Sequence, residues 1–329
     1  MKPNDLLELL ADGNAHSGSE LARKLGVTRA AVWKHMAKLA DWELDVTATP
    51  GRGYRLDRPI DLLDEAEMSA ALAARRLRGR IGRVERFFEL PSTNRHLLES
   101  PKPMPGFLDV CIAEFQSDGR GRRGRSWRAP LGGGLCLSVG WQFTETPPQL
   151  AALTLAIGVV VRRAVAEVAG VDIALKWPND LVHADRKLGG ILVELSAEAH
   201  GSCHVVAGVG INVAIPAAKL ATLSDWPRGA TDLTQATGGG PPPRTRLALE
   251  LIAACADLFA AYSARGFAAY REEWCNADYL RGKAVRVEAA SGPTFGVAAG
   301  IEPDGALLLE TDAGRQRIVS GDVTVRATP

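Results

Sequence analysis

The 329-residue chain carries 39 basic and 38 acidic side chains, and this net charge of +1 excludes nucleic-acid binding through overall basicity. A hydrophobic content of 46% and a charged content of 23% are typical of a folded protein with buried cores, and the length predicts two or three domains. The five cysteines are widely spaced without a Cys-x-x-Cys pair and the N-terminus lacks a signal-peptide core, so we expect reduced thiols, no zinc site and a cytoplasmic location.

Residues 1–58 are predicted to form a winged helix-turn-helix. Residues 6–10 supply a first short helix, and Ser17-Gly-Ser-Glu20 matches a capping box that opens a second. Gly26 ends that helix, and Thr28 begins a third, whose Val32, Met36 and Leu39 share one face. Residues 46–56, with Thr-Pro-Gly-Arg-Gly at their centre, predict a β-hairpin that forms the wing.

Charge is segregated within this unit. Residues 21–40 carry five basic side chains and no acidic one, which favours DNA binding. A protein-interaction bundle with one basic face is the alternative. The candidate DNA contacts are Ser19, Thr28, Arg29, Lys34, His35 and Lys38 on the helices and Arg52 and Arg55 on the wing.

A linker at residues 57–64 precedes a predicted helix at 65–78 and a strand at 84–89. The strand runs into Ser92-Thr93-Asn94, which either caps the next helix or supplies polar groups to a ligand at a strand end.

A second predicted strand, residues 110–115, leads into Asp118-Gly-Arg-Gly-Arg-Arg-Gly-Arg-Ser-Trp127, which contains four arginines and three glycines. The loop matches G-x-G-x-x-G, but Pro130 and residues 132–134 cannot begin the helix that a dinucleotide site needs. Three interpretations remain: a disordered Arg/Gly nucleic-acid segment, an anion-binding catalytic loop that orders on its ligand, or a solvated surface loop.

The next stretch predicts a strand at 135–143, a helix at 149–168 and a strand at 172–177 that ends in Lys176-Trp-Pro-Asn-Asp180. The most apolar run, residues 151–161, is too short to span a membrane and is expected to be buried. A hairpin around Asp185-Arg186 places Lys187 at the mouth of a strand that starts with Gly189-Gly190. The strand at 205–213 contains Gly208 and Gly210, which indicate either a bulge or a close approach of backbone to a ligand. His183 and His204 lack metal-ligand spacing and are expected to be structural.

Residues 220–229 and 238–243 are expected to be loops, and two helices at 246–262 and 267–275 follow. From residue 282 the pattern changes to short strands at 284–289, 295–301, 306–310 and 323–326, which predict a small β-barrel-like domain.

These motifs occur in the order found in biotin–protein ligases, and with the helix-turn-helix the whole chain resembles the bacterial bifunctional biotin ligase and biotin-operon repressor family. Residues 215–243 match that family poorly. The resemblance implies an α+β fold with a winged helix at 1–58, a mixed-sheet catalytic domain at 65–281 and an SH3-like barrel at 282–329. It also implies ATP-dependent formation of biotinyl-5′-AMP, with Mg²⁺, and transfer of biotin to a lysine of a biotin carboxyl carrier protein such as that of acetyl-CoA carboxylase. The further partners implied are operator DNA of biotin genes and a second copy of the chain in a ligand-promoted homodimer.

The same resemblance assigns roles to residues. Lys187, Arg122 and Asp180 would be catalytic. The biotin set would be Ser92, Thr93, Asn94, Gln116, Arg120, Gly121, Arg122, Lys187, Gly190 and Gly208. The adenylate set would be Arg120, Arg122, Arg125, Trp127, Asn179, Lys187, Asn212, Trp226 and Arg326. A lipoate–protein ligase and a DNA-binding regulator without ligase activity are the competing functions. We also expect the Arg/Gly loop to be mobile until an anionic ligand arrives.

Overall fold

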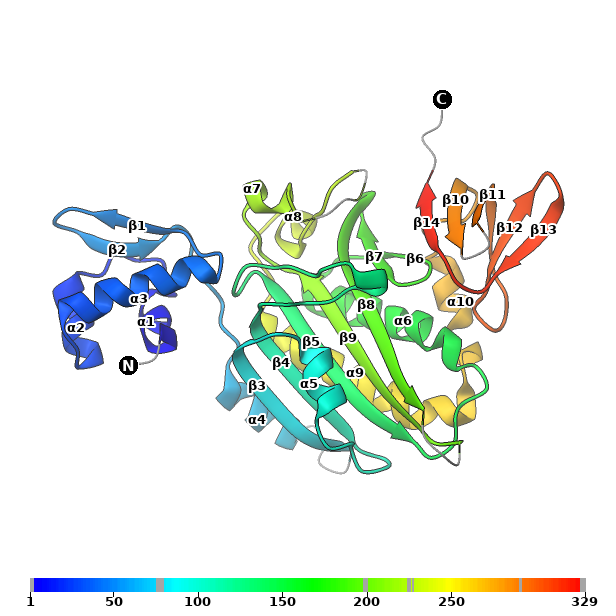
Figure 1. The fold of residues 1–329 in the computed structure, drawn as a ribbon, viewed down its shortest axis with the longest axis horizontal. Helices are drawn as coiled ribbons and strands as arrows, with labels where there is room; N and C mark the ends of the chain where they lie inside the picture. Colours follow the sequence, from blue (N-terminus) through cyan, green and yellow to red (C-terminus); the bar gives the residue numbers. More distant parts are fainter. Residues whose placement is uncertain are drawn as a thin grey trace.

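The computed structural model describes residues 3–74, 80–197, 201–223, 226, 228–289 and 292–325. Three parts follow one another along the chain: a helical unit with a small hairpin, a large sheet covered by helices, and a small all-β unit (Figure 1). This is the α+β arrangement expected from the sequence.

The N-terminal part is the predicted winged helix. It consists of α1 (Pro3–Leu10), α2 (Gly18–Leu25), α3 (Arg29–Asp41), β1 (Val46–Thr49) and β2 (Gly53–Leu56). Ser17 Oγ accepts the Glu20 N–H at 3.1 Å, and Thr28 Oγ1 accepts the Ala31 N–H at 3.2 Å, so both predicted N-caps are confirmed. Gly26 ends α2 at a φ of 63°, a left-handed conformation that favours glycine.

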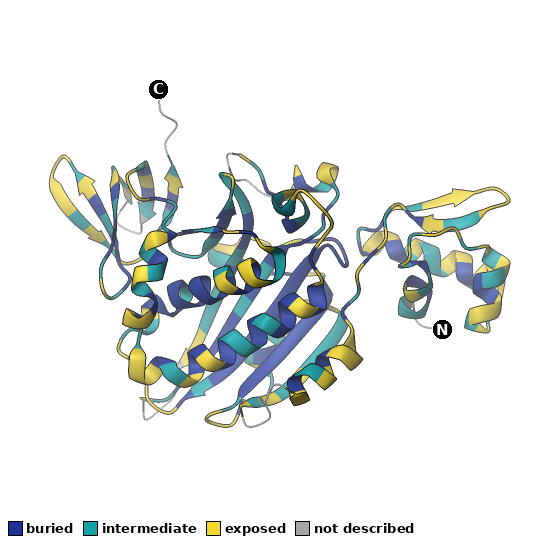
Figure 2. Cartoon of the chain, turned by 180° about the vertical axis from the view of Figure 1, so that it is seen from behind, coloured by how far each residue is buried: buried dark blue, intermediate teal, exposed yellow. Residues whose placement is uncertain are grey.

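The central part is a seven-stranded mixed sheet with strand order β3-β4-β5-β9-β8-β7-β6, in which only β3 and β4 run parallel. Helices α6 and α9 pack across one face (Figure 2), while α5 lies on the opposite face against β4, β5 and β9. The strands are β3 (Ile81–Leu90), β4 (Leu108–Gln116), β5 (Gly134–Phe143), β6 (Ala174–Lys176), β7 (Asp180–His183), β8 (Arg186–Ala197) and β9 (Cys203–Asn212). The helices are α4 (Glu65–Ala74), α5 (Thr93–Glu99), α6 (Leu153–Ala169), α7 (Ala217–Leu220), α8 (Leu233–Thr237), α9 (Arg244–Arg265) and α10 (Ala268–Asn276).

The structure departs from the predicted elements in the region 149–243. The helix expected from residue 149 begins with a 3₁₀ turn, Leu150–Ala152, before α6. The short helices α7 and α8 were not predicted, because four or five residues are too few to show a helical period. The hairpin before Lys187 is confirmed, with Ala184 and Asp185 at φ values of 48° and 61°.

The C-terminal part is an antiparallel sheet of five strands: β10 (Ala284–Ala289), β11 (Gly292–Ile301), β12 (Leu307–Thr311), β13 (Gly314–Ile318) and β14 (Asp322–Val325). Their order is β13-β12-β11-β10-β14. Because no pairing joins the edge strands β13 and β14 within the described residues, the expected barrel is not confirmed, although the sheet domain is. Strand β13 was not predicted, because its two arginines and its glycine make a weak strand pattern.

Helix α9 is long and apolar enough to cross a membrane, unlike the shorter run at 151–161 that the sequence pointed to. It packs against α6, β4 and β5 and contributes residues such as Leu251 and Phe259 to the main hydrophobic core. We therefore interpret it as a core helix of the sheet domain.

The winged helix shares a hydrophobic cluster with the sheet domain. Trp42, at the end of α3, packs its ring 4.8 Å from the Phe88 ring and donates its Nε1–H to Glu89 at 2.9 Å. Phe115 and Leu131 of the sheet domain belong to the same cluster as the winged-helix core. Arg128, which directly follows Trp127 of the Arg/Gly loop, pairs with Glu43 at 2.6 Å. The winged helix thus contacts the sheet domain at the C-terminal end of that loop.

A buried ion pair anchors the linker between these two parts. Arg244 Nη1 lies 2.8 Å from Glu114 Oε2, and both side chains are almost completely buried. The other Glu114 oxygen accepts the Leu63 N–H at 2.7 Å, and Arg244 Nε donates to the Gly134 carbonyl at 3.1 Å. The pair connects the linker with β4 and β5, the strands that carry the candidate site.

Candidate active site

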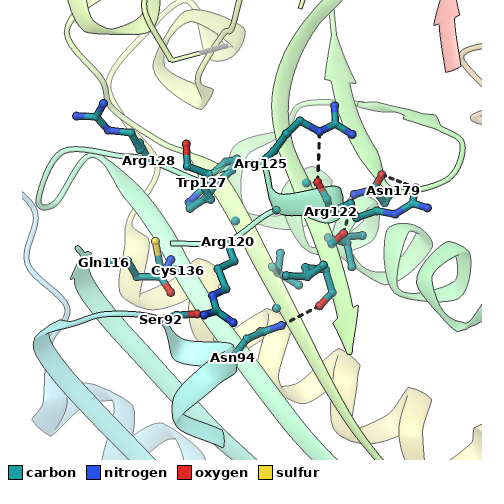
Figure 3. A pocket seen from close by; sticks show the side chains of 18 of the residues that line it. Ser92, Asn94, Gln116, Arg120, Arg122, Arg125, Trp127, Arg128, Cys136 and Asn179 are labelled. Atoms are coloured by element: carbon teal, nitrogen blue, oxygen red, sulfur yellow. Dashed lines mark hydrogen bonds between the residues drawn. The ribbon is translucent and has the colours of Figure 1, made fainter. Parts of the chain in front are cut away.

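One cavity of about 110 Å³ lies between the Arg/Gly loop and the α5 face of the sheet (Figure 3). It brings together residues from β4, α5, the loop, β5, β7, β8 and β9 that are far apart in sequence. The predicted site residues that line it are Ser92, Thr93, Asn94, Gln116, Arg120, Gly121, Arg122, Arg125, Trp127, Asn179, Asp180, Lys187, Gly190, Gly208 and Asn212.

The floor of the cavity is made of small side chains on three neighbouring strands. Gly210 of β9 pairs with Gly190 of β8 on one side and with Cys136 of β5 on the other. Two residues earlier in β9, Gly208 pairs with Ser138 of β5. Small residues in adjacent strands let other side chains approach the floor closely: the Trp127 ring lies over Gly210, and the Asn94 amide lies over Gly208. Burial raises the pKa of Cys136 to about 11, so this thiol is a neutral part of the floor.

Neutral hydrogen-bonding groups form one wall. Gln116 Oε1 accepts the Thr93 N–H at 2.7 Å and the Thr93 hydroxyl at 3.0 Å. Ser138 Oγ lies 2.6 Å from Asn94 Oδ1, and Asn94 Nδ2 donates to Glu194 at 2.8 Å. Ser92 caps α5 by accepting the Arg95 N–H at 3.4 Å, which confirms the capping interpretation, and it also lines the cavity.

Gly208 faces this wall closely, and we predict that Gly208→Ala disrupts it. A methyl group at position 208 would overlap the Asn94 amide. Asn94 would lose its hydrogen bonds, each of which is worth about 1 kcal/mol. We expect this loss to weaken the binding of biotin, the ligand that the family resemblance implies, roughly tenfold or more. Titration calorimetry with biotin measures this directly. Gly239→Ala, where a Cβ meets nothing within 4 Å, is the matched control, and equal affinities of the two variants would contradict the placement of Asn94.

Cations also line the cavity, and the Arg120 guanidinium lies beside Ser92 and Asn94 (Figure 3). The charged members are the cations Arg120, Arg122, Arg125, Arg128 and Lys187, with Asp180 as the one carboxylate among the described lining residues. Such an excess of cations suits a ligand with several negative charges.

Asp180 lies between two lysines. Its Oδ1 is 2.7 Å from Lys187 Nζ, and its Oδ2 is 3.3 Å from Lys176 Nζ. Burial raises the pKa of Asp180, but the charges of Lys187 and Lys176 outweigh burial and hold the pKa below its usual range. Lys176 is 8% exposed, and burial lowers its pKa. Asp180 therefore stays ionised and fixes Lys187 at the cavity wall.

The Arg/Gly loop is folded against the C-terminal sheet domain. Arg122 donates to Asn179 Oδ1 at 3.4 Å, and Arg125 pairs with Asp322 at 2.9 Å, with Arg123 Nη1 3.5 Å from the same carboxylate. The enclosed volume of about 110 Å³ is small beside the roughly 300–1,000 Å³ of typical ligand sites. A nucleotide and an acid would fit together only if the loop moved outward, which agrees with the expected mobility but does not test it.

We predict that Asp322→Ala releases the loop. Each partly exposed pair is worth about 0.2–1 kcal/mol, so loss of the carboxylate that Arg123 and Arg125 share should raise the open fraction of the loop about twofold to thirtyfold. Trypsin cleavage within residues 119–125 of the ligand-free protein reports this fraction, and bound biotinyl-AMP should suppress it. Asp312→Ala, in a turn of the same domain, is the control. Equal cleavage rates for the two variants would show that Asp322 does not hold the loop.

Some predicted site residues lie elsewhere. Trp226 is outside the cavity lining: its Nε1–H bonds to the Asp185 carbonyl at 2.9 Å, and Lys176 Nζ lies 4.3 Å from its ring centroid. Arg326 lies outside the described residues. The lining residues that the assigned roles omitted are Ser126, Arg128, Cys136, Ile191, Leu192, Val209, Gly210, Leu223 and Ala230. The alternation of small residues at 134, 136, 138 and 140 is a sequence signal that points to part of this set.

The predicted DNA contacts fall into two groups. The exposed ones are Ser19, Thr28, Arg29, Lys34, Arg52 and Arg55, and His35 is partly exposed. Lys38 instead lies at the boundary with the sheet domain, with its Nζ 3.5 Å from Asp41 and 3.8 Å from Glu89. Because these two carboxylates pair with the Lys38 ammonium group, we leave Lys38 out of the DNA contacts proposed below.

Comparison with known proteins agrees with this geometry. The model of the biotin/lipoate A/B protein ligase family matches residues 88–212, an HTH domain model matches 3–55, and a biotin protein ligase C-terminal domain model matches 281–326. The bifunctional ligase/repressor BirA of Escherichia coli is 35% identical over 326 residues, covering 99% of this chain and 97% of that protein. The chain belongs to the bifunctional biotin ligase/repressor family. BirA of Bacillus subtilis, 30% identical with 97% of each chain covered, is similar over the same extent.

Solved structures of this family share the fold of the two C-terminal parts. A biotin protein ligase from Aquifex aeolicus in complex with biotin and ATP superposes with a TM-score of 0.62 at 27% identity, covering 75% of this chain and all of that one. The matched ligase model spans lipoate enzymes as well, but the full-length relatives are named bifunctional ligase/repressor. Relatives that match 65–70% of the chain are named biotin–[acetyl-CoA-carboxylase] ligase. Family membership thus favours biotin over lipoate and an active ligase over a pure regulator.

Proposed function

We propose that this protein activates biotin with ATP to biotinyl-5′-AMP, transfers the biotinyl group to a lysine of a biotin carboxyl carrier protein, and represses biotin synthesis genes when the adenylate is bound. The observation that carries the proposal is a single cavity lined both by neutral hydrogen-bonding groups and by five cations. The domains of this function would be the winged helix at 1–58, the catalytic domain at 65–281 and the C-terminal domain at 282–329.

The neutral wall suits the ureido ring of biotin. Thr93, Asn94 and Gln116 offer donors and acceptors already held in place by one another and by Ser138. The Trp127 ring fills the space over Gly210, and the Asn94 amide fills the space over Gly208. A flat bicyclic ring would enter beside Asn94 once the loop that carries Trp127 moves outward. Preorganised polar groups at the end of an apolar depression fix a neutral ligand at low entropic cost. The carboxylate of biotin would then extend toward Lys187.

In the first step, an oxygen of the biotin carboxylate attacks the α-phosphorus of ATP, the bond to the bridging oxygen breaks, and pyrophosphate leaves. Two anions must meet, so the catalytic need is for fixed positive charge at the reacting centre. Arg120, Arg122 and Lys187 supply it, and Asp180 keeps Lys187 in position. Arg125 and Trp127 would bound the nucleotide, with Asn212 beside it. The family resemblance adds Trp226, which lies beside the cavity, and Arg326, which lies outside the described residues.

The donor set around the cavity fits a magnesium ion that arrives with the nucleotide. Mg²⁺ in such sites is held by one or two carboxylates together with substrate phosphates. Asp180 and the neighbouring Asn179 are the residues that would hold it, and no group of three or more His, Cys, Asp or Glu side chains suited to a metal is found in the described part of the chain. Bound there, Mg²⁺ would neutralise phosphate charge.

In the second step, the amine of the carrier lysine attacks the acyl carbon of biotinyl-AMP, and AMP leaves. The ionised Asp180 carboxylate would attract the approaching ammonium group and help to orient the amine. Incubation of the purified protein with ATP, biotin and an apo carrier domain tests the proposal through the mass of the carrier. A carrier that gains no biotin while the protein remains folded would contradict it.

Repression would use the winged helix in a homodimer. The exposed basic residues Arg29, Lys34, Arg52 and Arg55 supply phosphate contacts, and two copies on a palindromic site provide the contacts that one unit lacks. Strand β8 pairs with β7 only over residues 186–190, so residues 192–197 leave a free strand edge, with Leu195 53% exposed. Pairing of two such edges would join two protomers. Preference of the adenylate-saturated protein for its own biotin-gene promoter over random DNA tests this half.

A further inference from the structure

Helix α3 presents an apolar outer face. Trp33 is 69% exposed, and Ala30 and Ala37, one turn before and one turn after it, are also exposed. The opposite face of the helix packs inward through Val32 and Leu39, which are fully buried. Trp33 therefore contributes nothing to the core. Together with Ala30 and Ala37 it forms an apolar stripe on the helix that a helix-turn-helix places in the major groove of DNA.

The charges around Trp33 identify the chemistry of that partner. Arg29 lies one helical turn before Trp33 on the same face, and Lys34 lies beside it; both are exposed. The wing adds Arg52 and Arg55, also exposed. An apolar stripe bordered by cations is complementary to DNA. The phosphates of DNA would meet the cations, and the thymine methyl groups in its major groove would meet the apolar stripe.

The composition of α3 restricts which base feature it reads. The helix contains no Asn, Gln or Glu, and its single Asp41 lies at its C-terminal end near Lys38. It therefore lacks the amides that read adenine and a free carboxylate to read cytosine. The centre of the outer face offers only methyl groups and an indole. The thymine C5-methyl group is the major-groove feature that such a surface recognises.

We propose that Trp33 is a specificity-determining residue that contacts a thymine methyl group in each half-site, with Ala30 and Ala37 small enough to let the helix approach the base edges. This inference rests on the proposed repressor function and specifies the base feature that the repressor reads. Arg29 and Lys34 anchor the phosphates on either side, and their contacts carry little sequence information.

The experiment uses full-length protein saturated with biotinyl-AMP and a DNA duplex enriched from a randomised pool by that protein. Each thymine of the enriched duplex is then replaced, one at a time, by uracil, which removes only the methyl group. We expect at least one replacement in each half-site to weaken binding about fourfold, the value of one buried methyl group. Trp33→Ala should bind the thymine and uracil duplexes equally and should unfold at the same temperature as the unchanged protein.

Lys34→Ala is the matched control. It should weaken binding to both duplexes by the same factor, reduce the salt dependence of binding, and keep the thymine preference. A thymine preference that survives in Trp33→Ala, or a wild-type protein indifferent to every uracil replacement, would overturn the inference while leaving the repressor function standing. Failure to enrich any sequence would overturn the repressor function itself and this inference with it.

Discussion

Replacing Lys187 with alanine should slow biotinyl-AMP formation about a thousandfold while the protein remains folded. The ammonium group of Lys187 lies 2.7 Å from Asp180 at the cavity wall, where negative charge develops as carboxylate and phosphate approach each other. Removal of one preorganised charge-stabilising group from a reacting centre costs about 10²–10³ in rate, and a full positive charge between two anions lies at the upper end. Because Lys187 follows a tight turn and contributes little to the core, the stability of the fold should not change.

Single-turnover release of pyrophosphate measures this rate, and the unfolding temperature confirms the fold. Lys102→Ala, an exposed lysine that does not line the cavity, is the matched control and should retain the wild-type rate. Near-normal adenylation by folded Lys187→Ala would remove Lys187 from the mechanism.

Replacing Arg244 with methionine should destabilise the protein by about 3–5 kcal/mol, because Glu114 would be left as a buried charge without its partner. Arg244 is 1% exposed and Glu114 is 2% exposed, so water cannot compensate. The unfolding temperature should fall by about 4–7 °C for a protein of this size. The double variant Glu114→Leu with Arg244→Met, which removes both charges, should recover part of the loss.

Arg246→Met, on the same helix but exposed and 3.6 Å from Glu167, is the matched control and should change stability by less than about 1 kcal/mol. If Arg244→Met unfolds at the wild-type temperature, the ion pair does not anchor the linker to β4 and β5.

The sequence correctly predicted those features that depend on neighbouring residues in the chain. Ser17, Gly26 and Thr28 act through their own backbone neighbours, so the helix-turn-helix could be predicted residue by residue. The cavity residues could be grouped because their motifs stand at strand ends and in glycine-rich strands of one sheet. Their chemical roles were assigned from the family resemblance.

The features that escaped prediction depend on contacts between distant residues. Nothing local in the sequence pairs Trp42 with Phe88, or Arg244 with Glu114, and these contacts set how the winged helix meets the sheet domain. Lys38 looked like a DNA contact by its charge, whereas its position beside Glu89 is a tertiary effect. Trp226 looked like a lining residue, but it packs between Lys176 and Tyr279 beside the cavity.

The central claim is that one cavity joins biotin to the α-phosphate of ATP, and a burst experiment tests it most directly. The purified protein is mixed with biotin and ATP labelled at the α-phosphate, without a carrier protein, and the acid-stable adduct is counted against protein chains. We predict a rapid burst of biotinyl-AMP that approaches one per chain with biotin and none with lipoate. No burst with biotin, or an equal burst with lipoate, would contradict the assignment.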